Sequence, residues 1–382
     1  MTAQIDPFQA IAVSGLAHRL KAEGRSVIHM EFGQPSTGAP QPAIAAAHQV
    51  LENDPMGYWE SPQLKERIVQ HYADWYGLSI QPAQVLLTCG ASPALVLALN
   101  MSFNPGALVA FARPGYVAYR NTLKALHMTP VEIGCGESDR FQMSARALAE
   151  LAEAPAGLIL ASPANPTGTV IPREELIAIA EICRKRNITI ISDEIYHGIS
   201  YGVGTPSILE VSPDALVVNS FSKYWSMAGW RLGWLVVPPG GIDAARARMG
   251  NLFLTPPSLA QHAARVAMDC TAELQDNIAT YARNRALLLA ALPGMGLGRI
   301  APPDGAFYIY ADASDYTDNS MELCQQLLRD TGVATAPGVD FDPVDGRHFI
   351  RFSFAVSTPE IEEAIARIGP WFAARNRGSR RP

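Results

Sequence analysis

The chain has 382 residues, of which 48% are hydrophobic and 17% are charged, and its formal net charge is −6 at pH 7. A chain of this length predicts two domains, or three, each large enough to bury its own core. The acidic balance argues against the strongly basic surfaces that bind nucleic acids or anionic membranes.

The cysteine pattern and the distribution of apolar residues indicate the cellular compartment of the protein. The cysteines at 89, 135, 183, 270 and 324 are scattered and show no CxxC or Cys/His spacing. We therefore expect reduced thiols, with neither a disulfide framework nor a metal site. The sequence has no run of ~20 apolar residues that would span a membrane, and its first residues lack the pattern of a signal peptide. These features predict a cytoplasmic protein.

Short apolar runs alternate with helical patterns from about residue 85 onward. Residues 172–187 have apolar positions three and four apart, with Pro172 at the start, which predicts a helix. Alternation of this kind predicts an α/β fold with a mostly parallel sheet covered by helices on both faces. The strand-sized runs are VLLT (85–88), ALVAF (107–111), GLILA (157–161), ITIIS (188–192), ALVVN (215–219) and LGWLVV (232–237).

The region after about residue 255 has the pattern of a smaller α+β domain. Two long helical patterns (256–291) precede the strand FYIY (307–310), and a strand at 348–354 is followed by a helix from Thr358. We expect four parts: an N-terminal arm with part of the small domain (1–45), a large domain (46–275), a C-terminal small domain (276–375) and a disordered basic tail (376–382).

Polar residues follow four of the predicted strands at their carboxyl ends. Gly90 follows VLLT, Asn165 follows GLILA, Asp193 follows ITIIS, and the segment 220–223 follows ALVVN. Ligands of open α/β sheets bind at this edge. We therefore expect these loops, which are far apart in the sequence, to form one site.

Two of these loops contain Gly and Pro. In TCGASPAL (88–95) a glycine turn leads directly into a helix, whose first amides favour a phosphate. A tight turn with a serine cap is the alternative interpretation. In SPANPTGTV (162–170) Asn165 is offered from a rigid loop as a neutral donor, although such a stretch also occurs as a simple turn.

The other two loops carry charge. Asp193 in SDEIYHG (192–198) is either a buried carboxylate that needs a partner or a helix N-cap, and Tyr196 lies three residues further on. Lys223 is one of only five lysines, against twenty-five arginines, and it lies among hydroxyls with Arg231 nearby. An amine in such surroundings suits a Schiff base, and Arg231 suits a phosphate. Together these groups match a phosphorylated pyridine aldehyde.

The motifs NPTG, DEIY, SFSK with an arginine eight residues after the lysine, and FIRFSFA resemble those of the class I/II aminotransferases. These enzymes have fold type I and depend on pyridoxal 5′-phosphate (PLP). The resemblance runs from about Phe32 to Phe354. It implies a large domain with a seven-stranded type of sheet, a smaller α+β domain, and a homodimer with shared active sites.

The resemblance also implies residue roles. Lys223 would form the Schiff base with PLP and move the proton during a PLP/pyridoxamine phosphate cycle, and Asp193 would pair with the pyridine nitrogen. Arg351 and the backbone of Gly33 would bind the substrate carboxylate, together with Asn165. The remaining cofactor contacts would come from Gly90, Ala91, Ser92, Tyr116, Asn165, Tyr196, Ser220, Ser222 and Arg231, and from Tyr58 of the neighbouring subunit.

The motifs leave alternatives open. A PLP-dependent carbon–sulfur β-lyase would keep the lysine, the aspartate and the carboxylate-binding arginine. A PLP effector-binding domain of a transcription regulator is a non-enzymatic alternative, disfavoured by the acidic charge. A nucleotide-binding α/β protein with a structural lysine is a further one.

The sequence contains few features that indicate which substrate side chain is preferred. No second arginine stands in a recognisable place for a distal carboxylate. We therefore expect neutral aliphatic or aromatic amino acids to be preferred over aspartate, with Ile11, Val13 and Phe32 lining the pocket.

Overall fold

The computed structural model describes residues 5–375, and its largest element is a seven-stranded sheet with the order β2-β8-β7-β6-β5-β3-β4. Strand β8 is antiparallel to both neighbours, and the other pairs are parallel. The mostly parallel α/β sheet expected from the sequence is therefore confirmed. The strands are β2 (Val85–Thr88), β3 (Leu108–Arg113), β4 (Thr129–Gly134), β5 (Gly157–Ala161), β6 (Thr189–Asp193), β7 (Leu216–Ser220) and β8 (Gly233–Val236).

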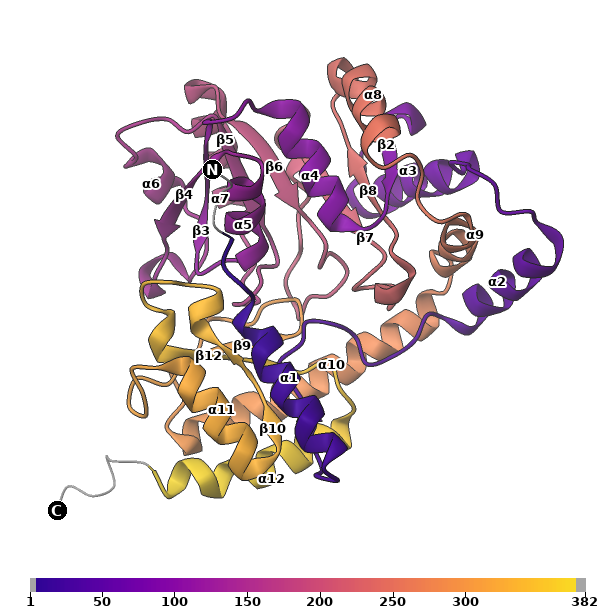
Figure 1. Ribbon diagram of the computed structural model, residues 1–382. Helices are drawn as coiled ribbons and strands as arrows, with labels where there is room; N and C mark the ends of the chain where they lie inside the picture. Colours follow the sequence, from indigo (N-terminus) through magenta and orange to yellow (C-terminus); the bar gives the residue numbers. More distant parts are fainter. Residues whose placement is uncertain (1–4, 376–382) are drawn as a thin grey trace.

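Helices cover both faces of this sheet, as Figure 1 shows. Successive strand residues point to opposite faces. Val217 belongs to the buried cluster that includes residues of α3 and α7, whereas Val218 belongs to the one that includes residues of α4, α5 and α8. Burial on both faces explains the continuous apolar runs of the central strands. The helices are α3 (Pro62–Tyr76), α4 (Ala91–Ser102), α5 (Val117–Ala125), α6 (Ala145–Ala149), α7 (Arg173–Arg186) and α8 (Ile242–Leu252).

Two smaller sheets lie beside the large one. One has the order β11-β12-β9 and the other pairs β1 with β10, so the N-terminal region joins the C-terminal part. Helix α1 packs on β11. It also packs on α11, and α10 packs on α12 (Figure 1). The strands are β1 (Ile28–His29), β9 (Tyr308–Asp312), β10 (Val333–Ala334), β11 (Ala336–Pro337) and β12 (Phe349–Ser353). The helices are α1 (Gln9–Ala22), α10 (Thr271–Ala291), α11 (Ser320–Thr331) and α12 (Thr358–Ala373).

Helices α2 (Gln41–Asn53) and α9 (Ser258–Ala267) pack against each other at one side of the molecule (Figure 1). All seven strands of the large sheet fall inside the expected large domain, whose boundaries stay a prediction. The expected basic tail at 376–382 lies outside the described residues. Within residues 5–375, no helix combines the length and the apolar character needed to cross a membrane.

Candidate active site

A cavity of about 470 Å³ lies at the carboxyl edge of the large sheet, bordered on its other side by α1 and the smaller sheets. The loops that follow β2, β5, β6 and β7 all reach it, as the positions of the polar residues predicted. The expected site residues that line it are Gly33, Ala91, Ser92, Tyr116, Asn165, Asp193, Tyr196, Ser222, Lys223, Arg231 and Arg351.

Four expected residues do not line the cavity. Gly90 lies directly behind it, against Arg231. Ser220 is fully buried and donates to the Ser222 hydroxyl at 2.8 Å. Tyr58 is 85% exposed on the surface. Val13 packs in the hydrophobic core instead of the pocket, because it lies on the buried face of α1.

The amine of Lys223 lies deep in the cavity. Its Nζ donates to the backbone oxygen of Gly33 and lies 5.8 Å from the centre of the Tyr196 ring. Burial lowers the pKa of the Lys223 ammonium to about 8, and repulsion from Arg351 acts in the same direction. At pH 7 roughly a tenth of this amine is therefore unprotonated and able to act as a nucleophile or a base, far more than for an ordinary lysine.

Asp193 ends strand β6 as a buried carboxylate. Its oxygens accept hydrogen bonds from the Tyr119 hydroxyl at 2.6 Å and from the Ile195 amide at 3.2 Å. Burial raises the pKa of Asp193 to about 6, although the Tyr119 hydrogen bond opposes this rise. Such an anion favours a cationic partner in the cavity.

Tyr119 is a site residue that the sequence interpretation missed. It lies three positions after Tyr116, the N-cap residue of α5, and the two rings meet edge to face at 5.5 Å. This helical spacing was the available signal. Both residues line the cavity, and Tyr119 orients Asp193 through its hydroxyl.

The start of α4 faces the cavity as an anion-binding corner. Gly90 precedes the helix with a φ of 100°, and a Cβ at this position would lie 2.6 Å from Nη2 of Arg231. Glycine therefore lets the guanidinium approach the first amides of α4, at Ala91 and Ser92. Helix amides, an arginine and the Ser222 hydroxyl together make a suitable site for a phosphate.

Arg351 of β12 lines the cavity from the small-domain side and is buried. Its Nη1 donates to Oδ1 of Asn165 at 2.8 Å, and its Nη2 donates to the backbone oxygen of Glu31. Its guanidinium lies between the rings of Tyr308 and Phe341, at 4.5 and 4.7 Å from their centres. Nε of Arg351 is buried without a partner. Such a fixed, incompletely satisfied cation suits a carboxylate ligand.

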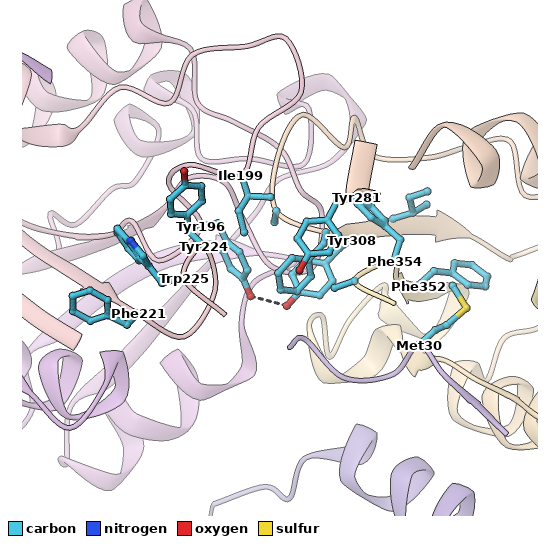
Figure 2. Packing of buried hydrophobic residues seen from close by; sticks show 14 of the residues in the cluster. Met30, Tyr196, Ile199, Phe221, Tyr224, Trp225, Tyr281, Tyr308, Phe352 and Phe354 are labelled. Carbon is cyan, nitrogen blue, oxygen red and sulfur yellow. Dashed lines mark hydrogen bonds between the residues drawn. The ribbon is translucent and has the colours of Figure 1, made fainter. Parts of the chain in front are cut away.

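Tyr308 connects the two ends of the site. Its hydroxyl forms a 2.6 Å hydrogen bond with the Tyr196 hydroxyl, which Figure 2 shows within the buried aromatic cluster. A Cβ on Gly33 would collide with the same hydroxyl, at 2.0 Å, so glycine is required there. Burial raises the pKa of Tyr308 to about 12, which keeps the phenol protonated. Tyr308 and Phe341 were both missed from the sequence, since neither belongs to a strand-end motif.

The arrangement matches proteins of known family. Residues 25–368 match the family model described as aminotransferase class I and II. A valine–pyruvate aminotransferase of Mycobacterium tuberculosis is 46% identical, with 98% of each chain covered.

Solved structures give the same result. The crystal structure of an aminotransferase from Mycobacterium tuberculosis has a TM-score of 0.94 at 46% identity, with 97% of each chain covered. An aspartate aminotransferase from Thermus thermophilus with maleate has a TM-score of 0.89 at 28% identity, covering 96% of this chain and 97% of that one.

Proposed function

We propose residue roles and a substrate class for this chain, which belongs to the class I and II aminotransferase family. It is an aminotransferase that moves an amino group from an L-amino acid to a 2-oxo acid with PLP as cofactor. The family match and these relatives favour transamination over the β-lyase, effector-binding and nucleotide-binding interpretations.

The donor set of the cavity fits PLP. The corner at Ala91, Ser92 and Arg231 would take the phosphate, because the glycine before it leaves no side chain in the way. The buried Asp193 would pair with the ring nitrogen and Tyr116 would contact the ring. Asn165 and Tyr196 would donate to the phenolic oxygen, and Lys223 would bond to the aldehyde carbon.

When bound, PLP supplies a cationic ring that accepts the electron pair left on the substrate α-carbon. Asp193 keeps the ring nitrogen protonated, since a buried carboxylate stabilises the adjacent cation. Arg351 holds the substrate carboxylate and thereby directs the α-hydrogen toward Lys223. The Lys223 amine, with its lowered pKa, would take that proton from the α-carbon and would deliver it to the aldehyde carbon of the cofactor.

We infer a neutral aliphatic donor such as valine, with a small neutral acceptor such as pyruvate. One observation supports this inference: among the described lining residues, the two arginines lie at the phosphate corner and at the carboxylate end, so neither is left for a distal carboxylate. Phe8, Ile11 and Phe32 also line the cavity and give it apolar wall. The relative named for valine and pyruvate is consistent with this choice.

A donor survey tests the substrate class. Purified enzyme is supplied with valine, leucine, phenylalanine or aspartate, with pyruvate or 2-oxoglutarate as acceptor, and kcat/KM is measured for each pair. We expect the neutral donors to exceed aspartate by at least about tenfold, because a buried carboxylate without a cation is costly. A tenfold preference for aspartate over leucine would refute the assignment.

We propose that two copies of the chain share their active sites. Tyr58 is exposed, and the hydrogen bond from Ser258 Oγ to the Gly57 oxygen at 2.7 Å brings this segment next to the start of α9. Leu252 and Leu254 are exposed apolar side chains before the same helix. These side chains suit a subunit interface, in which Tyr58 would reach the phosphate in the other copy.

Sedimentation equilibrium and cofactor titration test the dimer. We expect a particle of twice the chain mass, and Tyr58→Phe should weaken cofactor binding about fivefold through one lost hydrogen bond while the dimer persists. A fully active monomer would contradict the proposal.

A cytoplasmic location also stays a proposal, supported by five cysteines that are all free, three of them buried.

A further inference from the structure

Helix α1 is capped by a residue from the far end of the chain. The residue before the helix, Phe8, is extended and offers no side-chain cap. Asp340 replaces that cap: its Oδ1 accepts the amide of Gln9 and its Oδ2 accepts the amide of Ala10, each at 2.7 Å. A carboxylate in this position satisfies two helix amides and complements the helix dipole.

Asp340 is also part of the cavity wall. Its side chain is buried, 3% exposed, and borders the cavity together with Ala10 and Phe341. Within residues 5–375 it has no ion-pair partner, and the cations whose charges act on it are Arg351 and Arg120. The cavity wall therefore contains a buried carboxylate that forms no direct ion pair among the described residues, and Arg351 and Arg120 attract it only from a distance.

The loop that carries Asp340 is fixed on both sides. Phe341 stacks on the guanidinium of Arg351, and the amide of Gly115 donates to the Phe341 oxygen at 2.9 Å. Asp342 accepts from Arg113 Nη1 at 2.5 Å. Asp340 thus has a fixed position relative to both the carboxylate-binding arginine and the end of strand β3.

The same contacts determine what the substrate side chain meets. Asp340 holds the first turn of α1 in place, and this turn presents Phe8 and Ile11 to the cavity. A neutral side chain gains apolar contact there. A side-chain carboxylate would lose water and meet a like charge, which disfavours it in a poorly solvated cavity.

We propose that Asp340 is a specificity-determining residue that holds the first turn of α1 over the cavity and selects against donors with a side-chain carboxylate. This inference rests on the proposed preference for neutral donors. It assigns the two effects, docking of α1 and charge discrimination, to one side chain. Because these effects have different chemical causes, different substitutions separate them.

Two substitutions separate charge discrimination from docking of α1, and a third serves as a backup. Asp340→Asn removes the charge and keeps one acceptor. Gln9→Pro removes one amide donor and keeps the charge. Proline suits the first helical position, and the extended Phe8 before it is compatible with proline. Asp340→Ser, which is neutral and smaller, is a second charge-free variant in case the asparagine variant folds poorly.

The readout is kcat/KM for aspartate divided by kcat/KM for valine, measured on PLP-loaded enzyme with its cofactor absorption verified. We expect Asp340→Asn and Asp340→Ser to raise this ratio about tenfold over the unmodified enzyme. Gln9→Pro should raise KM for valine and for aspartate alike, roughly fivefold, because α1 is docked for less of the time and the undocked pocket binds neither donor well. The ratio should therefore stay unchanged. Asp330→Asn removes a carboxylate from α11 that binds Trp371, far from the cavity, and should change neither quantity.

An unchanged ratio in both charge-free variants would overturn the proposal, as would an equal change of the ratio in Gln9→Pro. Failure of the proposed function has a different signature, since the unmodified enzyme would then itself prefer aspartate. The change caused by the substitutions is measured relative to that enzyme in either case.

Discussion

The cavity has two sides that are built in different ways. On the strand-end side, formed by the loops after β2, β5, β6 and β7, several supporting contacts are local, such as Ser220 with Ser222 and Asp193 with the Ile195 amide. Asp193 also accepts from Tyr119, 74 positions earlier in the chain. On the small-domain side, formed by α1, β9, β12 and the loop before β12, the contacts are long-range. Arg351 reaches Asn165 across 186 positions, and Asp340 reaches Gln9 across 331.

The two sides of the cavity suit two different tasks, cofactor binding and substrate binding. The strand-end side holds the groups that suit the cofactor, and these groups lie at or just after the ends of their own strands. The small-domain side holds the groups that suit the substrate, and they are positioned only when both ends of the chain have folded together. Substitutions on the two sides should therefore have separable effects on chemistry, substrate binding and cofactor binding.

The largest effect is expected for Lys223→Ala on the strand-end side. Loss of the nucleophile and base should lower turnover by about 10³-fold or more, while the phosphate corner still binds PLP. Single-turnover kinetics, cofactor absorption and the loss of the borohydride-reducible link to the protein would measure this. Near-normal transamination by the variant would refute the role of Lys223.

Substitutions of Arg351 and Arg231 test the difference between the two sides of the cavity directly. Arg351→Ala should raise the donor KM about a hundredfold and change cofactor affinity little, because it removes a buried charge-assisted contact to the substrate. Arg231→Ala should instead weaken PLP binding about tenfold, since Arg231 is exposed at the phosphate corner. Cofactor titration of the cofactor-free proteins and steady-state kinetics distinguish the two. Equal cofactor loss in both variants would mean that these assignments are wrong.

The smallest effect concerns pH. In the cofactor-free protein the pKa of Asp193 is about 6, and the Tyr119 hydrogen bond holds it below the value that burial alone would give. PLP affinity should fall as the pH drops through this pKa, because a protonated carboxyl no longer attracts the ring cation. Tyr119→Phe removes the hydrogen bond, so the midpoint should rise by about one pH unit. Cofactor titrations between pH 5 and 8 measure it.

A matched control for this experiment is Tyr201→Phe. Tyr201 is a largely buried phenol that donates to the Ala306 oxygen at 2.7 Å and does not contact Asp193. Its loss should leave the midpoint in place. A midpoint that moves downward in Tyr119→Phe, or equally in both variants, would contradict the role given to Tyr119.

The sequence predicted the strand-end side well because its elements are local. Apolar runs located six strands of the large sheet, and their ends located Asn165, Asp193 and Lys223. Strand β4 was missed, since Pro130 and Glu132 interrupt its apolar pattern. Pro130 is tolerated there because β4 lies at the sheet edge.

The small-domain side was predicted only in part. Arg351 came from a family motif, but Tyr308, Phe341 and Asp340 have no local signal. Their roles depend on contacts with Tyr196, Arg351 and the start of α1. The placement of Val13 failed for a related reason: the helical pattern of α1 does not tell which face meets the core until its packing partners are known.

The cap that Asp340 gives to α1 also has a consequence during protein synthesis. Gln9 leaves the ribosome early, whereas its partner is made 331 residues later, roughly twenty seconds to a minute at ordinary translation rates. During that interval the first amides of α1 lack their carboxylate. A nascent or prematurely terminated chain can therefore fold much of the large sheet without a finished substrate pocket, so the enzyme acquires its selectivity last.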